Sequence, residues 1–211
     1  MRTQEQVNEI VRLLMEEYPL AGCTLDWNKA YELLFSVRLA AQCTDERVNK
    51  ITPALFARFP TLEAFAKADV AEVEEYVRSC GFYHSKARDI VACANVLLEK
   101  YGGELPRTME ELTALPGVGR KTANLILGDV FKIPGSTVVD THCIRISNLL
   151  GLVDNLKDPV KIEMELRKIL PPEHSSDFCH CIVLHGRAVC IARRPECERC
   201  CVRHLCRHYS G

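Results

Sequence analysis

The sequence predicts an all-α protein, and three observations carry that prediction. Apolar residues recur every three or four positions along most of the chain, which places them on one face of a helix. No stretch alternates apolar and polar residues convincingly enough for a strand. Glycine and proline also divide the chain into segments of helical length. The clearest periodic sets are Val7, Ile10, Val11 and Leu14; Tyr31, Leu34, Phe35 and Leu39; and Val91, Ala94 and Leu97.

The breaks between these segments give the expected elements in order. They fall at Gly22, Pro60, Gly81, residues 102–106, Pro134-Gly135, Gly151 and Pro171-Pro172. The first periodic set precedes the first break, the second lies between the first two breaks, and the third lies between the third and the fourth. Because a helix ends at or before such a break, about ten helices are expected. No long repeat, low-complexity segment or transmembrane run interrupts them.

Composition leaves the partner of the chain open. Of its 211 residues 47% are hydrophobic, which is enough for one large domain or two small lobes. The 27 basic and 28 acidic residues give a net charge of -1, so overall charge does not favour a nucleic-acid partner. Residues 179–211 differ, because six arginines there outnumber two glutamates, as in a phosphate-binding patch or a solvated tail. Those arginines are Arg187, Arg193, Arg194, Arg199, Arg203 and Arg207.

The amino terminus reads Met-Arg-Thr-Gln-Glu-Gln-Val, which is charged and lacks the apolar region of a secretion signal. We therefore expect a cytoplasmic protein whose thiols are reduced.

The most informative segment is Leu-Pro-Gly-Val-Gly-Arg-Lys-Thr-Ala, residues 115–123. Pro116 ends the preceding helix, and Gly117 and Gly119 allow backbone angles and a close approach that a side chain would forbid. The amides at the start of the next helix would attract a phosphate. The segment is not the longer loop that wraps a nucleotide triphosphate, so a single backbone phosphate is the expected ligand. An ordinary turn between two helices is the alternative.

Lys121 lies in the first turn of that second helix, where a cation opposes the helix dipole. Asp140 follows an apolar pair within Val-Val-Asp-Thr-His, residues 138–142, at the start of another helical pattern. Taken alone, Asp140 is a helix N-cap, because aspartate accepts hydrogen bonds from first-turn amides. A carboxylate near a lysine amine is also a plausible catalytic pair, and both roles of Asp140 can hold at once.

Four cysteines near the carboxyl end, Cys190, Cys197, Cys200 and Cys206, have the spacing C-x6-C-x2-C-x5-C. Four thiolates so close together predict a metal site. A structural zinc would more usually show two close C-x2-C pairs, whereas a [4Fe-4S] cluster also takes four thiolates, so spacing alone leaves the two nearly equal. A disulfide framework is the weakest alternative in a reducing compartment.

Together these motifs resemble endonuclease III, a family of helix-hairpin-helix DNA glycosylases that carry an iron-sulfur cluster. The resemblance covers nearly the whole chain, and its cysteine spacing is similar to that of the family's cluster loop. It therefore implies a [4Fe-4S] cluster, rather than zinc, on the four cysteines of residues 190–206. The motifs that carry it are residues 115–124, residues 139–142, Ala-Ala-Gln-Cys-Thr-Asp from Ala40, Gly-Phe-Tyr-His-Ser-Lys-Ala from Gly81, and the cysteine run.

The resemblance also implies a two-lobed architecture. Residues 23–133 would form a six-helix lobe that carries the helix-hairpin-helix. Residues 1–22 and 134–211 would form a discontinuous lobe with the cluster loop, and a DNA-facing cleft would lie between the lobes. The implied partner is double-stranded DNA with a damaged base or an abasic site, bound by a monomer that is nucleoid-associated if bacterial and has no membrane partner.

The activity that the resemblance implies is that of a bifunctional DNA glycosylase and AP lyase of base excision repair. The free amine of Lys121 would attack C1′ of a damaged nucleotide, expel the base and form a Schiff base that permits β-elimination. Asp140 would stabilise the developing positive charge and orient the amine. The implied substrates are oxidised pyrimidines.

Such an enzyme must rotate its target out of the duplex and support the gap. By resemblance, Gln42 and Phe82 fill that gap, and residues Gly117, Val118, Gly119 and Arg120 contact the DNA backbone. Phe82 departs from the family, where an aliphatic wedge is usual. Without the resemblance, Gln42 would be a polar residue at a helix end and Phe82 a core aromatic.

The remaining cysteines and histidines have simpler interpretations. Cys201 is a spare thiol or an alternative ligand beside Cys200. His142 is expected near the active site, whereas His180 and His185 are expected to be structural. The other cysteines are expected as small core residues. They are Cys23, Cys43, Cys80, Cys93, Cys143, Cys179 and Cys181.

Three rival functions stay open. An adenine-mismatch glycosylase would carry an acidic residue on the helix leading to Gln42, where this chain has Ser36-Val37-Arg38. A noncatalytic damage-binding protein would need neither Lys121 nor Asp140. A zinc-stabilised DNA-binding module would lack the brown colour of an iron-sulfur protein.

Overall fold

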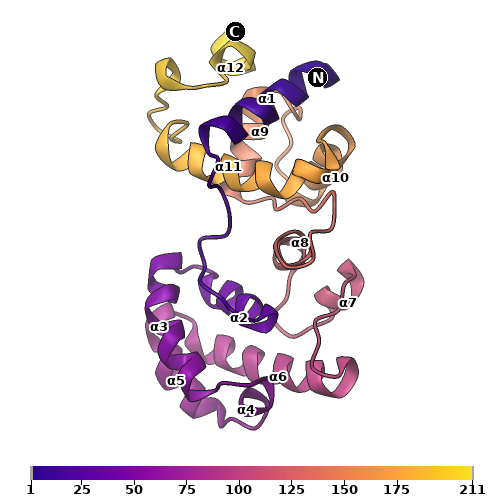
Figure 1. Cartoon of the computed structure of the whole chain (residues 1–211). Coiled ribbons are helices and arrows are strands. Elements are labelled where there is room, and N and C mark those ends of the chain that lie inside the picture. The colour runs from indigo at the N-terminus through magenta and orange to yellow at the C-terminus, as the bar shows by residue number, and fades with distance from the viewer. Residues whose placement is uncertain (1, 211) are drawn as a thin grey trace. The chain divides into compact units, whose positions relative to one another are not determined.

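The computed structural model describes residues 2–210, and its regular elements there are twelve α-helices and four short 3₁₀-helices, with no strand (Figure 1). The all-α prediction is confirmed. The helices outnumber the expected ten because α4, α7 and α12 have only four or five residues. Segments that short cannot display a helical period, so the sequence pattern could not separate them from loops.

The chain divides into two compact units. We call Thr24–Val130 the hairpin unit, and residues up to Cys23 together with those from Phe131 onward the cysteine unit. No described helix combines the length and the apolar character that crossing a bilayer requires.

The hairpin unit contains seven α-helices among its described residues, one more than the six that the resemblance implied. Two of the seven, α4 and α7, have only five residues each. In order, the elements are α2 (Ala30–Ala40), α3 (Asp45–Arg58), α4 (Leu62–Ala66), α5 (Val70–Val77), η1 (Arg78–Cys80), α6 (Tyr83–Tyr101), α7 (Met109–Thr113) and α8 (Arg120–Asp129).

Local sequence sets where these helices begin. Four of them start at a threonine or aspartate whose side chain accepts from a first-turn amide, which satisfies a donor that the helix itself leaves unpaired. These N-caps are Thr44 of α3, Thr61 of α4, Asp69 of α5 and Thr108 of α7. The longest helix, α6, ends at Gly102 in the left-handed conformation that favours glycine.

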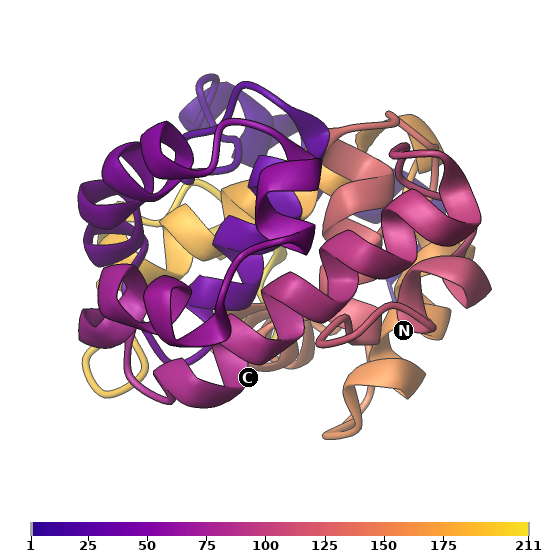
Figure 2. The ribbon, with the colours of Figure 1, turned by 90° about the horizontal axis from the view of Figure 1, so that it is seen from below.

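An aromatic core holds the hairpin unit together. Phe65 of α4 lies with its ring centroid 5.1 Å from both Phe35 of α2 and Phe59 at the end of α3. The helix α6 runs beside α4 and α5 and buries Ile90 and Leu97 (Figures 1 and 2). Both contacts bury a large apolar area, and the Phe35–Phe65 pair has the preferred edge-to-face geometry, with 71° between the ring planes.

The cysteine unit combines the first α-helix of the described chain with the last four. Its elements are α1 (Gln4–Glu17), α9 (Thr141–Leu150), α10 (Pro159–Ile169), η2 (Pro172–His174), α11 (Ser175–Ala188), η3 (Cys197–Arg199), η4 (Arg203–Leu205) and α12 (Arg207–Ser210).

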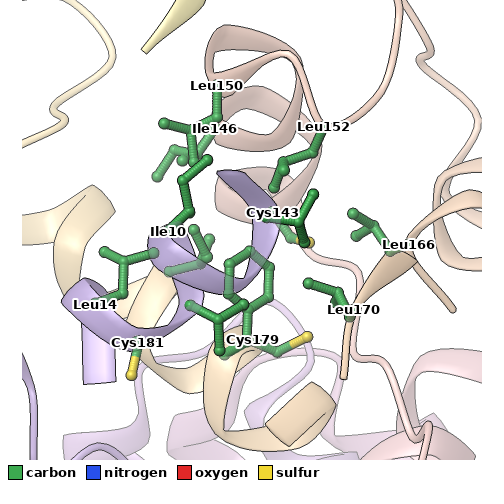
Figure 3. Packing of buried hydrophobic residues seen from close by; sticks show 14 of the residues in the cluster. Ile10, Leu14, Cys143, Ile146, Leu150, Leu152, Leu166, Leu170, Cys179 and Cys181 are labelled. Carbon is green, nitrogen blue, oxygen red and sulfur yellow. The ribbon is translucent and has the colours of Figure 1, made fainter. Parts of the chain in front are cut away.

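Apolar residues from α1, α9, α10 and α11 meet in one buried cluster (Figure 3). Ile10 and Leu14 of α1 join Ile146 and Leu150 of α9 in this cluster. Gly186 of α11 permits the close approach of α9, because a Cβ there would lie only 2.4 Å from Nδ1 of His142.

Candidate functional site

The hairpin connects α7 to α8 through two glycines. Gly117 has φ +73°, in the left-handed region that favours glycine, and the amide of Val118 donates to the carbonyl of Leu115 at 3.2 Å. Gly119 is the N-cap of α8, and its carbonyl accepts from the amide of Ala123 at 2.9 Å. Because Gly119 has no side chain, no cap covers the amino end of α8 from within the turn.

Gly117 lies directly against an ion pair between α2 and α6. Nε of Arg38 donates to Oδ2 of Asp89 at 2.7 Å. A Cβ at position 117 would lie 2.8 Å from that oxygen and 2.9 Å from that nitrogen. The sequence predicted a close approach at Gly117 but not the surface it approaches, since Arg38 and Asp89 are separated by 51 positions.

Lys121 is the second residue of α8, and its side chain is exposed in the hairpin unit. The buried face of α8 is formed instead by Ala123, Asn124, Ile126 and Leu127. The amine is therefore presented at the uncapped end of the helix and not packed into the core.

Asp140, in the cysteine unit, is the N-cap of α9. Its Oδ1 accepts from the amide of Cys143 at 2.8 Å, and the residue is half-buried. The segment leading to it is fixed by two further hydrogen bonds: the amide of Gly135 donates to the carbonyl of Pro172 at 2.7 Å, and Oγ of Ser136 donates to the carbonyl of Ile133 at 2.7 Å. The second carboxylate oxygen of Asp140 has no hydrogen bond among those formed within the described chain.

Gln42 and Phe82 share an unusual backbone conformation. Gln42, between α2 and α3, has φ +56°, and Phe82, the N-cap of α6, has φ +46°. Both are exposed, and Phe82 is 68% exposed, so the interpretation of Phe82 as a core aromatic is wrong. The left-handed region costs a residue with a side chain about 1–2 kcal/mol, which the surrounding contacts must offset.

Lys86 was not identified from the sequence, although it contacts the helix end that precedes each of these two residues. It is only 1% exposed, and its Nζ donates to the carbonyls of Leu39 at 2.8 Å and Cys80 at 2.7 Å. Burial lowers the pKa of this amine. A lysine within a helical pattern is predicted to be exposed to solvent. Only the position of Lys86 in the Gly81–Ala87 motif could have indicated that it is important.

In the cysteine unit, one pocket is lined by all four predicted ligands together with apolar residues of α9 and with His185 of α11. The four thiols are those of Cys190, Cys197, Cys200 and Cys206. Within residues 2–210, no three histidine, cysteine or carboxylate side chains converge as a preformed metal site. The four thiols therefore line a common pocket, but their side chains do not converge on a single position.

Cationic and polar groups surround these thiols. Nη1 of Arg145 donates to Sγ of Cys190 at 3.5 Å, and Sγ of Cys206 donates to the carbonyl of Leu149 at 3.5 Å. Burial raises the pKa of Cys200 to about 12, so its thiolate forms only where a cationic centre compensates. No sequence motif indicated that Arg145 contacts Cys190.

His185 connects the pocket to α1. Its Nδ1 lies 3.1 Å from the hydroxyl of Tyr18, and its Nε2 lies 3.4 Å from Sγ of Cys200. Burial lowers the pKa of His185 to about 4, so the ring is neutral at physiological pH. The sequence predicted a structural histidine but not its contact with a candidate ligand.

Cys201 does not line the pocket. Burial, and to a smaller extent the nearby charge of Glu17, raise its pKa to about 11. Of the remaining cysteines, five are buried and two are half-buried, in agreement with their expected role in packing. The two half-buried thiols are those of Cys23 and Cys43.

Three of the six carboxyl-terminal arginines are held by acidic partners. Arg199 pairs with Glu196, Arg203 with Glu198, and Arg207 with Asp154. Arg193 and Arg194 are exposed and make no ion pair among the described residues. These two are therefore the best candidates for phosphate contacts in the predicted patch.

An all-helical chain whose glycine hairpin leads into an uncapped helix with a first-turn lysine has the features of a helix-hairpin-helix repair protein. The sequence model of the HhH-GPD superfamily of base excision DNA repair proteins matches residues 35–172. The chain is 46% identical to the endonuclease III of a Synechocystis species over 96% of its own length and 92% of that protein. It is 40% identical to the Escherichia coli K12 endonuclease III, over 95% and 94% of the two chains. The chain belongs to the endonuclease III family.

Solved structures agree with this assignment. A trapped endonuclease III-DNA covalent intermediate superposes with a TM-score of 0.91 at 39% identity, covering all of this chain and 98% of that one. A thermostable thymine-DNA glycosylase, at 22% identity and a TM-score of 0.87, shares the fold over 98% and 97% of the two chains.

Proposed function

We propose that this chain is a bifunctional DNA glycosylase and AP lyase that removes oxidised pyrimidines from double-stranded DNA. The observation that carries the proposal is the exposed amine of Lys121 at the uncapped amino end of α8, immediately after the Gly117–Gly119 turn. The same few residues offer backbone amides for a phosphate and a nucleophile for the adjoining sugar.

Lys121 acts in its neutral form. Its Nζ forms a bond to C1′ of the damaged nucleotide as the glycosidic bond breaks, and the electron pair of that bond leaves with the base, which takes up a proton. Opening of the sugar gives an iminium between Nζ and C1′. Loss of a proton from C2′ then expels the 3′ phosphate, which cleaves the strand, and water releases the amine.

Asp140 supplies a carboxylate that stabilises positive charge during this reaction. Because Oδ1 is engaged by the amide of Cys143 at 2.8 Å, the carboxylate has a fixed orientation. Its other oxygen is available to stabilise the positive charge that develops on the sugar, which is the usual role of a preorganised charge in catalysis.

Binding to the duplex uses two sets of residues. Gly117, Val118, Gly119 and Arg120 hold a backbone phosphate through the turn and the start of α8. Gln42 and Phe82 enter the space left when the damaged nucleotide rotates out, Gln42 by hydrogen bonding to the partner base and Phe82 by stacking. Their exposure and left-handed backbone suit side chains that project from the surface.

The four cysteines of the pocket fit a [4Fe-4S] cluster. Their thiols line one space, and the guanidinium of Arg145 beside Cys190 complements the negative charge of a thiolate-bound cluster. When bound, the cluster would cross-link the loop of residues 190–206, which carries Arg193 and Arg194. Iron and sulfide analysis of the purified protein tests this assignment against zinc.

Borohydride trapping on a duplex with one thymine glycol tests the reaction. Wild-type protein should give a covalent adduct, whereas Lys121→Ala should lose adduct and strand cleavage by at least about 10³-fold while still binding the damaged duplex. A Lys121→Ala protein that cleaved at the wild-type rate would overturn the mechanism. Tight binding without any wild-type adduct would favour a monofunctional glycosylase or a damage-binding protein, which release of free base would then distinguish.

A further inference from the structure

Lys86 joins two helix ends in the hairpin unit. Its ammonium group lies inside the unit and donates to the carbonyl of Leu39, in the last turn of α2, and to that of Cys80, the last residue of η1. The last carbonyls of a helix lack partners within the helix and carry partial negative charge. A cation placed between two such ends stabilises both.

Each of these carbonyls lies just before one of the gap-filling residues. Leu39 precedes Gln42 by three positions, and Cys80 precedes Phe82 by two. A single side chain therefore links the two turns from which these residues project. The Phe82 turn is further fixed to α6, since the carbonyl of Phe82 accepts from Oγ of Ser85 at 2.9 Å and from the amide of Lys86 at 3.2 Å.

The left-handed backbone of Gln42 and Phe82 makes such a link necessary. Residues with side chains stay in this region only where their surroundings fix them. Without the link, each turn could relax toward a more favourable backbone angle, and the direction of its side chain would change. The two turns belong to separate helix connections, so nothing in the local sequence coordinates them.

The free-energy cost of burying Lys86 also indicates that its two hydrogen bonds are important. Among the described residues no carboxylate pairs with its ammonium group, and the charged or ionisable side chains that influence its pKa are the thiols of Cys43 and Cys80 and the cation of Arg38. A buried cation without a counter-ion is costly, and a methionine would fill similar space without that cost. What the ammonium adds is its pair of hydrogen bonds.

We propose that Lys86 is a positioning residue that holds Gln42 and Phe82 as a matched pair, so that both enter the gap in the duplex together. The proposal rests on the gap-filling role given above to these two residues. Lys86 itself touches neither DNA nor the reacting atoms. Replacing Lys86 should therefore slow the reaction only on substrates in which a duplex has to be opened.

The test compares two substrates for wild type and Lys86→Met. One is a duplex with a single thymine glycol, where a partner base must be supported. The other is a single-stranded abasic oligonucleotide, where no base is orphaned. We expect base release from the duplex to slow by about 10- to 100-fold, because small misplacements of binding groups have effects of this size. Borohydride trapping on the single strand should stay within about twofold, since the Schiff-base chemistry is unchanged.

A direct readout comes from 2-aminopurine placed opposite the lesion. Wild-type binding should change its fluorescence as the partner base loses its stacking, and Lys86→Met should reduce that change. Cys93→Ala is the matched control, because Cys93 is almost equally buried on α6 but lies two turns further along, and its side chain forms no hydrogen bond with either turn among the described residues. Cys93→Ala should lower stability and leave the ratio of duplex to single-strand rates unchanged.

Equal losses on both substrates, or an unchanged duplex rate with an unchanged fluorescence signal, would overturn the positioning role. Absence of trapping by the wild type on either substrate would instead overturn the proposed function. If Lys86→Met does not fold, Lys86→Gln retains a hydrogen-bond donor without the charge. It should show a smaller duplex-specific loss, and a proportional loss on both substrates would contradict the proposal.

Discussion

The two units support their functional groups in opposite ways. In the hairpin unit, Lys121, Gln42 and Phe82 are exposed, and polar contacts beneath them hold the turns in place. In the cysteine unit, the four candidate ligands are themselves half-buried, and three of them, Cys190, Cys200 and Cys206, pack against the apolar cluster. A substitution at a functional position of the hairpin unit should therefore remove little core packing. In the cysteine unit, the same side chains belong to both the site and the core, so a substitution there should affect both.

Asp140 gives the sharpest test of this contrast, because it combines a structural and a proposed catalytic role in the cysteine unit. Asn caps a helix about as well as Asp, so Asp140→Asn should preserve stability while glycosylase turnover falls by about 10²- to 10⁴-fold. Asp140→Ala should show the same loss of turnover and also lose about 1 kcal/mol of unfolding free energy. Single-turnover kinetics and denaturant titrations separate the two, and equal activity of Asp140→Asn and wild type would refute the catalytic role.

The neighbouring cysteines test whether site and core coincide. Cys200→Ala should lose iron, sulfide and visible absorbance and should unfold at a lower temperature, since both a ligand and a packed side chain are removed. Cys201→Ala removes a similar side chain that does not line the pocket, so it should keep the metal content of wild type. If Cys201→Ala also lost iron, the assignment of the four ligands would be wrong.

The two hairpin glycines form a matched pair. Gly117→Ala forces a left-handed alanine, at a cost of about 1–2 kcal/mol, and pushes a methyl group against Asp89 and Arg38. It should weaken binding to damaged and undamaged duplexes alike, because a phosphate contact is lost. At Gly119 a Cβ meets nothing within 4 Å and φ is negative, so Gly119→Ala should be nearly neutral in stability. Similar melting temperatures for the two variants would contradict this account.

The ion pair beneath Gly117 should have a smaller effect. Arg38 and Asp89 are both partly exposed, which limits such a pair to about 1 kcal/mol. A double-mutant cycle with Arg38→Met and Asp89→Asn measures the coupling by unfolding free energy. Extending the cycle to Gly117→Ala should give non-additive values, whereas strict additivity would show that the turn does not depend on the pair.

The smallest effects are expected from the surface arginines of the cysteine unit. Arg193→Gln and Arg194→Gln should each lower the salt dependence of DNA binding by about one unit of slope, since each removes one phosphate contact. Arg199→Gln is the control, because Arg199 is paired with Glu196. An equal change in slope for all three variants would indicate that the arginines act through the overall electrostatic field and not through specific phosphate contacts.

The sequence predicted the elements whose signals are local. The hairpin glycines, the first-turn position of Lys121 and the N-cap role of Asp140 each depend on a few adjacent residues, and the structure places them in such positions. Contacts between distant segments could not be predicted in this way. Arg38 meets Asp89 across 51 positions, and Lys86 meets Leu39 across 47, with no periodic pattern to join them.

Phe82 shows the other limit of sequence interpretation. A large aromatic residue after a glycine reads as part of the core, and only the resemblance to a family suggested that it projects outward. Its exposure comes from the left-handed backbone at Gly81 and Phe82, which the contacts of Ser85 and Lys86 maintain. The conformation of one residue is here set by side chains from the following helix, and a propensity scale does not contain that information.

The place of α1 in the cysteine unit has a consequence for biosynthesis. Glu17 ends α1, and the residues that share the buried cluster with α1 begin at Val139, just before α9, so the ribosome must make the intervening chain first. At about 5–20 residues per second this interval lasts roughly 6–25 seconds. The hairpin unit, one continuous stretch, emerges complete during this time, while the apolar face of α1 still lacks its partners. A nascent α1 is therefore a site where a chaperone could bind, until synthesis of α9 and α11 allows the unit to close.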